Sequence, residues 1–426
     1  MTHFNPVLTH PALKLGADLD GWFAAGGGRG LEAALAAPEK IIETVEASGL
    51  RGMGGAGFPT HRKWAAAAQA RGGDKQAAGV DKYVVCNGNE DEPGTFKDRY
   101  LLRWTPHQVI EGALIAAVAI RANHVILYIN PHQSEGTAEA RRAVQQWQGA
   151  DLLRRVESLI GGPLRLSVAA TSGRYIGGEE TAVISSIEGK FPFPQRKPPF
   201  PAESGVWGDP TLINNTETLA NTPHILARGA DWFRALGVGD AVGTKLYSLS
   251  GDVLRPGLYE LPMGTSLREL IFSHGGGMLS DKAFKAVFTG GPSNTLLTAK
   301  DLDVALDFDS VRARRSRLGT GAMIVISDGA SIVRKVADYI AFFAEGSCGQ
   351  CPPCKSGTFQ LARLLDRVSS GRSTPGELEA LLSLCRILPG SGRCALIDGA
   401  VTVVESSLYT FPEEYGLSED QAIHFI

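Results

Sequence analysis

This chain of 426 residues contains few cysteines, few long apolar runs and little excess of charge of either sign. Its 6 cysteines are too few to form a disulfide scaffold for a protein of this size. The longest apolar run, about 109–120, is interrupted by Glu111 and is shorter than the roughly 20 residues that cross a membrane, which favours a buried helix. A formal net charge of -3 gives no reason to expect binding to nucleic acid or to an anionic membrane.

The N-terminus also lacks the features of a secretion signal. Residues 1–15 contain no long apolar segment and carry Pro6 and Pro11. We therefore expect a cytoplasmic protein without a membrane span, in which clustered cysteines bind metal rather than form disulfides. Glycine, in contrast, is abundant, at 51 of 426 residues, and it lets a backbone approach a ligand closely.

The first half of the chain has the pattern of an α/β domain. After an irregular lead-in (1–45), strand-like apolar runs alternate with helical stretches over 46–240. This alternation predicts a mostly parallel sheet. The predicted strands are 83–86, 124–129 and 164–169, and the predicted helices include 106–121 and 136–148.

The second half of the chain predicts two smaller domains. Short β-type runs with Gly-Pro turns surround one helix (266–272), which indicates an α+β domain over 241–328 that resembles the ubiquitin-like SLBB module. Apolar residues then recur at helical spacing, and Thr374 begins a capping box. Residues 329–426 are therefore predicted to form a helical bundle.

Four of the six cysteines form a pattern inside that bundle: Cys348, Cys351 and Cys354 are spaced C-x2-C-x2-C, and Cys394 follows 40 positions later. One loop of this spacing can hold three corners of an iron–sulfur cube, and a distant thiolate can close the fourth. A four-cysteine zinc site is the main alternative, although such sites usually pair two C-x2-C knuckles. Cys385 is the other candidate for the fourth ligand, but its apolar helical surroundings favour a buried residue.

A glycine-rich loop occupies residues 52–58, and Lys63 follows it. Its backbone N–H groups can hold a phosphate, to which Lys63 adds positive charge. It matches neither the dinucleotide fingerprint G-x-G-x-x-G after a strand nor a Walker loop. A packing turn therefore remains an alternative, and the polar blocks at 175–181, 196–201 and 213–218 are equally well explained as loops.

An acidic loop, 87–99, follows the first strand-like run. In open α/β sheets, ligands bind at the carboxyl ends of strands. The amides of Asn87 or Asn89 could therefore bond a flavin ring, and Glu90 and Glu92 could contact the ring or a nicotinamide. A solvated acidic loop is the alternative.

Six motifs occur in the order GGAGFPT, EPGTFKDR, YIxGEET, KPPFP, NNxET and CGxCxPC. Over about residues 45–415 they resemble the 51 kDa flavoprotein subunit of respiratory complex I, the NADH-quinone oxidoreductase. They are similar also to diaphorase subunits of NAD-reducing hydrogenases and formate dehydrogenases. The resemblance implies a Rossmann-like FMN/NAD-binding α/β domain, the SLBB domain and a helical bundle that carries one 4Fe-4S cluster.

The resemblance also implies roles for individual residues. NADH would stack on the flavin, with its adenine packed on Phe58 and Phe200 and with Glu180 and Lys197 near the nucleotide. The cluster would take the four patterned cysteines. FMN would be bound by Gly52, Gly54, Gly55, Ala56, Gly57, Lys63, Asn87, Asn89, Glu90, Gly178, Glu179, Ile213, Asn214, Asn215 and Thr216.

Several positions depart from the family pattern. Met53 replaces an Arg, Asn89 an Asp, Gly177 a Cys and Gly346 a Glu, and Ala66 replaces a second adenine-stacking aromatic. The fold and cofactor predictions do not depend on these positions. The flavin potential, the nucleotide affinity and the identity of the parent complex do.

The predicted function is that of an NADH dehydrogenase subunit: hydride passes from NADH to FMN, and single electrons pass on to the cluster. Glu92 and Tyr175 would line the nicotinamide side, with Glu92 tuning the site. The implied partners are a thioredoxin-like 2Fe-2S subunit and further iron–sulfur subunits, on the peripheral arm of a complex such as NADH:quinone oxidoreductase. A diaphorase subunit of a soluble hydrogenase or formate dehydrogenase is the alternative, and a non-catalytic four-cysteine scaffold is a further one.

Overall fold

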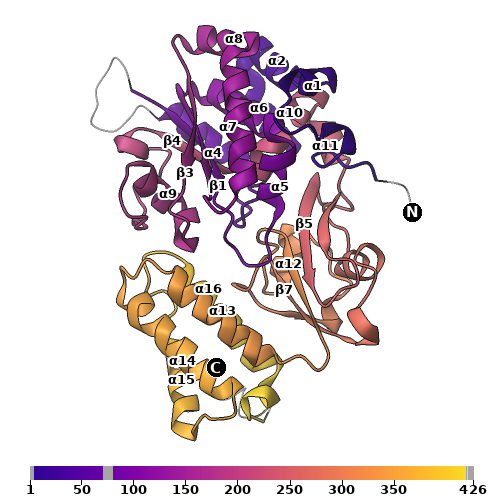
Figure 1. Cartoon of the computed structure of the whole chain (residues 1–426), viewed down its shortest axis with the longest axis vertical. Helices are drawn as coiled ribbons and strands as arrows, with labels where there is room; N and C mark the ends of the chain where they lie inside the picture. The colour runs from indigo at the N-terminus through magenta and orange to yellow at the C-terminus, as the bar shows by residue number, and fades with distance from the viewer. Residues whose placement is uncertain (1–3, 71–79, 419, 421–426) are drawn as a thin grey trace.

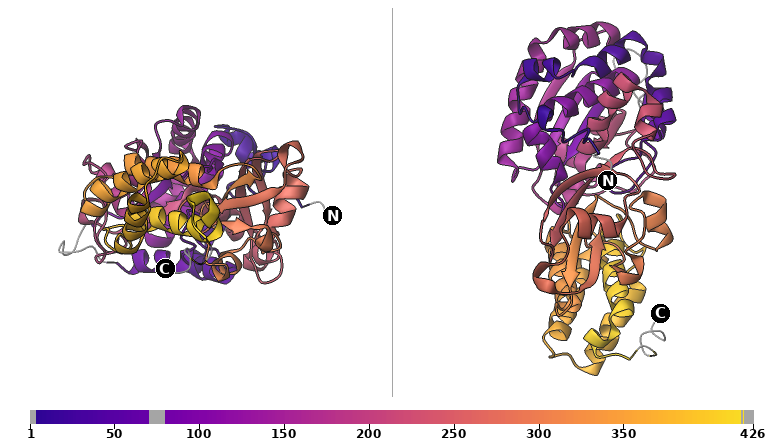
Figure 2. Two further views of the ribbon diagram at one scale, coloured as in Figure 1. Left: turned by 90° about the horizontal axis from the view of Figure 1, so that it is seen from below. Right: turned by 90° about the vertical axis from the view of Figure 1, so that its right-hand side faces the viewer.

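The molecule has three parts, of which the α/β domain forms one end (Figure 1). A five-stranded sheet and a bundle of helices lie side by side at the other end, as a second direction of view confirms (Figure 2). The structure is a computed structural model that describes residues 4–70, 80–418 and 420. The mixed α/β class, the SLBB-type sheet domain and the C-terminal helices agree with the predicted fold.

A four-stranded parallel sheet in the order β3-β2-β1-β4 forms the centre of the α/β domain. Its central strands are short and almost entirely buried, as is typical of parallel sheets covered by helices. The strand order reverses between β1 and β4, and such a switch point is where ligands bind in α/β sheets. The strands are β1 (Tyr83–Gly88), β2 (His124–Ile129), β3 (Arg165–Ala170) and β4 (Thr211–Asn215).

Helices cover this sheet, and the most buried of them is α6 (Pro106–Ile120), the helix predicted from the longest apolar run. It packs closely on α10 (Thr216–Arg228), since a Cβ at Gly112 would lie only 1.9 Å from the carbonyl oxygen of Leu219. Only glycine permits this approach. The other helices are α1 (Leu19–Ala24), α2 (Arg29–Ala36), α3 (Ile41–Ser48), α4 (Thr60–Gln69), α5 (Lys97–Trp104), α7 (Ser134–Gly149), α8 (Asp151–Ile160), α9 (Glu180–Ile187) and α11 (Ala230–Arg234).

The second sheet is mixed, in the order β6-β5-β9-β7-β8. The helix predicted at 266–272 is present at 267–274, where it is mainly π-helical (Glu269–His274) and ends two residues later than predicted. Strand β6 was not predicted, because Pro256 and Gly257 indicated a turn at its start. The elements are β5 (Thr244–Gly251), β6 (Gly257–Pro262), β7 (Phe284–Thr289), β8 (Leu297–Thr298), β9 (Ala322–Ser327) and α12 (Phe308–Ala313).

Both faces of this second sheet are buried, in different hydrophobic cores. Side chains of adjacent residues in a strand point to opposite faces. Val287 and Val325 therefore belong to the core shared with the α/β domain, whereas Phe288 and Ile324 belong to the core of the C-terminal helices. The ring of Phe288 contacts the ring of Tyr339 edge-on at a centroid distance of 5.1 Å. The sheet thus contributes one face to each of the two cores.

The C-terminal bundle contains the predicted helical pattern and capping box. Thr374 and Glu377 each cap the backbone of the other, and α15 begins at Pro375 as predicted. The cysteine loop leaves the end of α13 and continues into a π-helical turn at Pro353–Thr358. The helices are α13 (Ile332–Gly346), α14 (Phe359–Ser369), α15 (Pro375–Ile387) and α16 (Leu396–Thr410).

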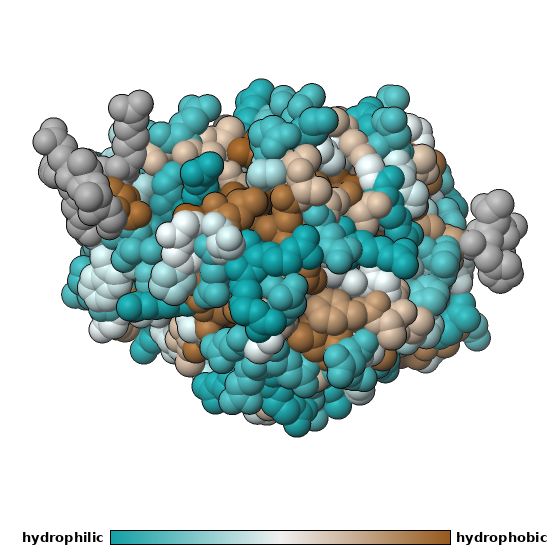
Figure 3. Space-filling view, turned by 90° about the horizontal axis from the view of Figure 1, so that it is seen from above, coloured by the Kyte–Doolittle hydropathy of each residue, from teal (hydrophilic) through white to brown (hydrophobic). Residues whose placement is uncertain are grey.

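The surface at the end formed by the α/β domain is mainly hydrophilic (Figure 3). Hydrophobic side chains appear on this face in separate groups among polar and charged ones. Within the part of the chain that the structure describes, no helix has the length and apolar character needed to cross a membrane.

Candidate functional site

A cavity of about 310 Å³ lies where the three parts of the molecule meet. Its wall includes Gly54 of the glycine-rich loop, Asn215 at the end of β4, and Cys394 of the helical bundle. This volume is within the range of small-molecule binding sites. The remaining lining residues are Asn87, Asn89, Glu90, Asp91, Glu92, Thr95, Asp98, Tyr175, Ile176, Gly178, Glu179, Ser293, Arg317, Thr320, Ala395, Leu396 and Gly399.

The cavity brings together the central part of the predicted site. The predicted residues in its wall are Gly54, Asn87, Asn89, Glu90, Glu92, Tyr175, Gly178, Glu179, Asn215 and Cys394. The predicted residues outside this wall are Gly52, Gly55, Ala56, Gly57, Phe58, Lys63, Glu180, Lys197, Phe200, Ile213, Asn214, Thr216, Cys348, Cys351 and Cys354. Sequence reasoning missed Ser293, Arg317 and Thr320, which no motif marks and which come from the sheet domain.

The glycine-rich loop closes on itself beside the cavity. The amide of Gly52 donates to the carbonyl oxygen of Phe58 at 2.8 Å, and α4 begins directly afterwards, at Thr60. Where the loop passes Asn215, a Cβ at Gly54 would lie 2.9 Å from the Cβ of Asn215, so a larger residue would not fit there. The loop backbone therefore forms the cavity wall itself, as a cradle for a bound group requires.

Two strands of the parallel sheet end at the cavity, at Asn87 and Asn215. Asn87 Nδ2 donates to the carbonyl oxygen of Gly178 at 2.9 Å, which holds the 175–179 segment against β1. Asn215 is the N-cap of α10, and its Oδ1 accepts from the amide of Glu217 at 3.0 Å. A helix N-terminus beside a ligand cavity favours negative charge.

Glu92 carries a half-buried carboxyl group in the wall, and desolvation raises its pKa to about 7. It accepts hydrogen bonds from the hydroxyls of Tyr175 (2.7 Å) and Ser293 (3.2 Å). These three side chains belong to the acidic loop, the 175–179 segment and the sheet domain, respectively. A carboxyl group that titrates near neutral pH in a ligand cavity is typical of functional sites.

Asp91 explains why this chain has Asn89 where the family has Asp. Asn89 Nδ2 donates to one oxygen of Asp91 at 2.7 Å, and Asn130 donates to the other. An aspartate at 89 would instead place two carboxylates together, and burial already raises the pKa of Asp91. The side-chain amide of Asn89 therefore suits this position, because it can donate to the carboxyl group of Asp91.

An ion-paired chain joins α4, α9 and the proline-rich loop. Glu180 pairs with Lys63 at 2.8 Å and also with Lys197. Burial alone would raise the pKa of Glu180, but the two ammonium groups lower it to about 2. Phe58 and Phe200 have exposed fractions of 49% and 52%, and unusually exposed aromatic rings are suited to stacking on a base.

The four patterned cysteines are free thiols. Burial, and to a smaller extent the charge of the neighbouring thiols, raises the pKa of Cys354 to about 11 and that of Cys394 to about 12. Four thiolates are the usual donor set of an iron–sulfur cube. Cys385 is buried in α15. The described residues contain no group of three or more His, Cys, Asp or Glu side chains placed to hold a single metal ion.

Two further departures from the family pattern have steric reasons. A Cβ at Gly346 would lie 2.9 Å from the Cβ of Tyr175, and a Cβ at Gly177 would lie 2.7 Å from Oγ of Ser172. Contacts this short do not occur, so a larger residue at 346 would require the backbone near Tyr175 to move, whereas one at 177 would require the Ser172 hydroxyl to turn away. Glycine at 346 lets Tyr175 pack closely on the end of α13.

Three family models match the chain. Residues 45–224 match the Nuo51 FMN-binding domain, residues 246–293 match the SLBB domain, and residues 334–417 match the NADH-ubiquinone oxidoreductase-F iron-sulfur binding region. These matches fall on the α/β domain, the second sheet and the helical bundle. They support FMN, NADH and a 4Fe-4S cluster as the cofactors and substrate.

Similar proteins carry corresponding names. An NADH-quinone oxidoreductase subunit of Rhizobium meliloti (strain 1021) is 42% identical over 415 residues, which are 97% of each chain. The NADP-reducing hydrogenase subunit HndC of Solidesulfovibrio fructosivorans is 40% identical over 93% of this chain and 80% of that one. The crystal structure of an air-oxidized NAD+-reducing NiFe hydrogenase matches with a TM-score of 0.79 and 33% identity, over 95% of this chain and 66% of that chain.

Proposed function

Because this chain belongs to the family of NADH-quinone oxidoreductase 51 kDa flavoproteins, we propose that electrons pass through the cavity described above on their way from NADH to the cluster. The chain is an NADH dehydrogenase that uses FMN and one 4Fe-4S cluster. When bound, FMN supplies the exchange between the two-electron chemistry of NADH and the one-electron chemistry of the cluster. The observation that carries the proposal is that Gly54 and Asn215 share one cavity with Cys394.

The cradle would hold FMN through the backbone of the glycine-rich loop and the two strand ends. Gly54 and Asn215 would contact it from one side, and Asn87 and Gly178 from another. Helices α9 and α10 begin directly after the cavity residues Glu179 and Asn215, and helix N-termini of this kind would favour the phosphate. The other residues proposed to bind FMN are Gly52, Gly55, Ala56, Gly57, Lys63, Asn89, Glu90, Glu179, Ile213, Asn214 and Thr216.

The nucleotide would bind across the ion-paired chain. Phe58 and Phe200 would pack on the adenine, and Lys197 and Glu180 would contact the rest of the nucleotide. Because the Glu180 carboxylate already compensates part of the positive charge in this region, a bound phosphate would compete with Glu180 for Lys197. NADH affinity should therefore fall as ionic strength rises.

Glu92 and Tyr175 would act on the nicotinamide side. With its pKa near 7, Glu92 can hold or release a proton at the pH of the cell. The hydroxyl of Tyr175 fixes the orientation of that carboxyl group. We assign these two side chains to positioning the reacting ring and to tuning its electrostatic surroundings, because the cofactor itself accepts the hydride.

Cys348, Cys351, Cys354 and Cys394 would ligate the cluster. Cys348 and Cys351 lie in the loop after α13, Cys354 lies in the π-helical turn that follows, and Cys394 lies just before α16. Because Cys394 also lines the cavity, the cluster would lie at the edge of the flavin site. Electrons would then leave through this part of the bundle to a partner.

The parent complex is proposed to be an NADH:quinone oxidoreductase, with this chain in its cytoplasmic peripheral arm. A thioredoxin-like 2Fe-2S subunit and further iron–sulfur subunits would be its partners. The similarity to a hydrogenase subunit and to an NAD+-reducing hydrogenase structure favours one alternative, a soluble diaphorase. Mass spectrometry of the proteins that co-purify with the chain separates the two: quinone-reducing membrane subunits support the first, and a hydrogenase or formate dehydrogenase large subunit supports the second.

A visible spectrum of the purified chain tests the proposed function. The expected spectrum has a flavin band above a broad iron–sulfur shoulder, and the flavin band bleaches when NADH is added. Addition of NADPH in a parallel sample measures the preference between the two nucleotides. A colourless protein that contains zinc would overturn the proposal.

A further inference from the structure

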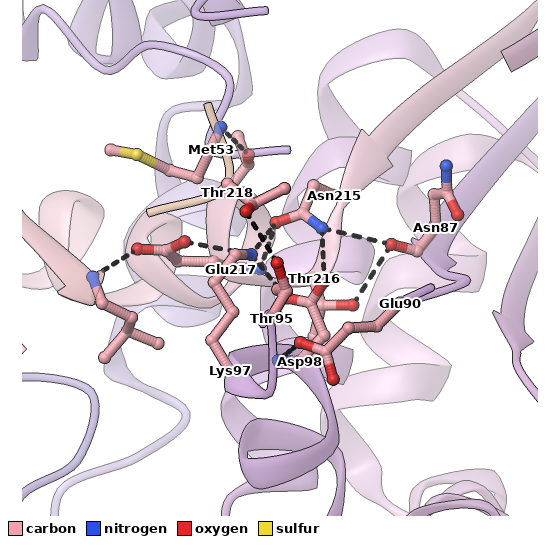
Figure 4. A network of polar contacts seen from close by, with 12 residues as sticks. Met53, Asn87, Glu90, Thr95, Lys97, Asp98, Asn215, Thr216, Glu217 and Thr218 are labelled. Atoms are coloured by element: carbon pink, nitrogen blue, oxygen red, sulfur yellow. Dashed lines mark hydrogen bonds and ion pairs between the residues drawn. The ribbon is translucent and has the colours of Figure 1, made fainter. Parts of the chain in front are cut away.

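A set of fully buried charges lies directly behind the cradle. Figure 4 shows Lys97, Asp98 and Glu217 directed toward one another and toward Asn215. Lys97 Nζ lies 2.7 Å from Asp98 and 3.1 Å from Glu217, and Glu217 forms a second ion pair with Lys245. Lys97, Lys245 and Glu217 have side-chain exposures of 0%, and that of Asp98 is 5%. Two positive and two negative groups thus balance each other with almost no exposure to water, and of the four Asp98 reaches the cavity wall.

This buried set fixes Asn215, which lies in the cavity wall. Lys97 Nζ donates to Asn215 Oδ1 at 2.9 Å, and Asn215 Nδ2 donates to Asp98 at 2.7 Å. Because both ends of the amide are bonded, its orientation is determined by the charges behind it. A change in those charges would therefore alter how the Asn215 amide is held in the cavity wall.

Lys245 is the one member of the set that comes from the second sheet, where it lies in β5. Its ammonium lies 3.5 Å from the carbonyl oxygen of Met53, the residue before Gly54. Glu217 also accepts from the amide of Leu246 at 2.8 Å. Desolvation lowers the pKa of Lys245 to about 8, so the group still carries its charge at pH 7. A single lysine thereby links the SLBB-type domain to the back of the glycine-rich loop.

We propose that Lys245 is a positioning residue for the flavin site: it supplies, from the SLBB-type domain, the charge that balances Glu217 behind the cradle and so sets the reduction potential of FMN. This inference rests on the proposed function. Loss of the Lys245 charge would leave one carboxylate uncompensated in a region of low dielectric constant. Addition of electrons to a flavin beside that carboxylate would become less favourable.

The experiment compares the full-length wild-type chain with three variants. Lys245→Met removes the charge, and Lys245→Met combined with Glu217→Gln removes both charges and restores the balance. Lys285→Met is the matched control, because Lys285 makes another ion pair between the second sheet and the bundle, with Glu414 at 2.6 Å. FMN content and the FMN midpoint potential are measured at pH 7 by a redox titration followed at the flavin band.

The expected result is a more negative FMN potential in Lys245→Met, a return toward the wild-type value in the double variant, and no shift in Lys285→Met. If Lys245→Met loses FMN, recovery of FMN binding in the double variant supports the inference and absence of recovery overturns it. An unchanged potential in an FMN-loaded Lys245→Met, or the same shift in the single and double variants, also overturns it. A wild-type chain that binds no FMN would instead contradict the proposed function.

Discussion

The hydroxyl of Tyr175 donates a 2.7 Å hydrogen bond to the half-buried carboxyl group of Glu92. The ring of the same tyrosine packs edge-on against Phe342 and Phe343, near the end of α13 and close before the cysteine loop. Tyr175 thus contacts both the acidic loop of the flavin site and the helix that precedes the cluster ligands.

Tyr175→Phe should lower the rate of NADH oxidation while FMN remains bound. The ring packing is kept, but Glu92 loses a hydrogen bond worth about 1.5–3 kcal/mol, which corresponds to a loss of roughly 10- to 100-fold. Steady-state kinetics with NADH and ferricyanide measure the effect. Tyr259→Phe, whose hydroxyl bonds to Arg255 and His274 within the second sheet domain, is the control and should retain the wild-type rate. A wild-type rate in Tyr175→Phe would remove this tyrosine from the site.

Glu92 should make stability depend on pH. Its pKa is raised from 4.5 to about 7, so between these values the folded protein keeps a proton that the unfolded chain releases. Stability should therefore fall as pH rises from about 4.5 to 7, by at most about 3 kcal/mol, and this loss should be absent in Glu92→Gln. Thermal unfolding at pH 5, 6, 7 and 8 measures it. The gain in Tm of Glu92→Gln over wild type should grow with pH up to 7, and a constant difference would contradict the assigned ionisation.

Phe200→Ala and Phe58→Ala should raise KM for NADH without loss of FMN. Both rings are half exposed, and stacking on a base is worth about 1–3 kcal/mol, which predicts an increase in KM of roughly 5- to 150-fold. The value of kcat should change little, because the adenine is remote from the reacting ring. Phe272→Ala, another exposed ring but on the second sheet domain, is the control. An unchanged KM in both Phe58→Ala and Phe200→Ala would place the adenine elsewhere.

Cys394→Ala should lose the cluster, whereas Cys385→Ala should keep it. Cys394 lines the cavity and is affected by the thiols of Cys354 and Cys348, whereas Cys385 is buried in α15 beside Tyr415. Iron and labile sulfide content, with the electron paramagnetic resonance signal of the reduced protein, measure the result. Cluster loss in Cys385→Ala with retention in Cys394→Ala would reverse the assignment of the fourth ligand.

The sequence predicted the elements whose signals are local. The apolar run that became α6 and the capping box of Thr374 depend on residues within a few positions of each other, so their pattern is visible along the chain. Strand β4 was missed because its apolar part, Leu212 and Ile213, is short and runs directly into the polar Asn214 and Asn215. That polar end made the segment resemble a loop.

The rest of the site depends on contacts between distant segments. Ser293 reaches Glu92 across 201 positions of the chain, and Lys245 reaches Met53 across 192. Neither residue belongs to a motif, and burial of a lysine is not expected from its chemistry. Such residues can be found only when the second sheet is placed against the α/β domain. Asn130, which follows β2 and supports Asp91, can likewise be found only when β1 and β2 are placed side by side.

The two faces of the second sheet belong to two different hydrophobic cores. This limits where the chain can be cut into fragments that fold separately. Phe288 and Ile324 complete the interior of the C-terminal helices, although they precede residue 329 in the chain. A fragment cut at that position would leave each piece with a bare apolar face. The iron–sulfur bundle therefore cannot be moved into another protein by itself. Chimeras between relatives should exchange the sheet and the bundle as a single unit.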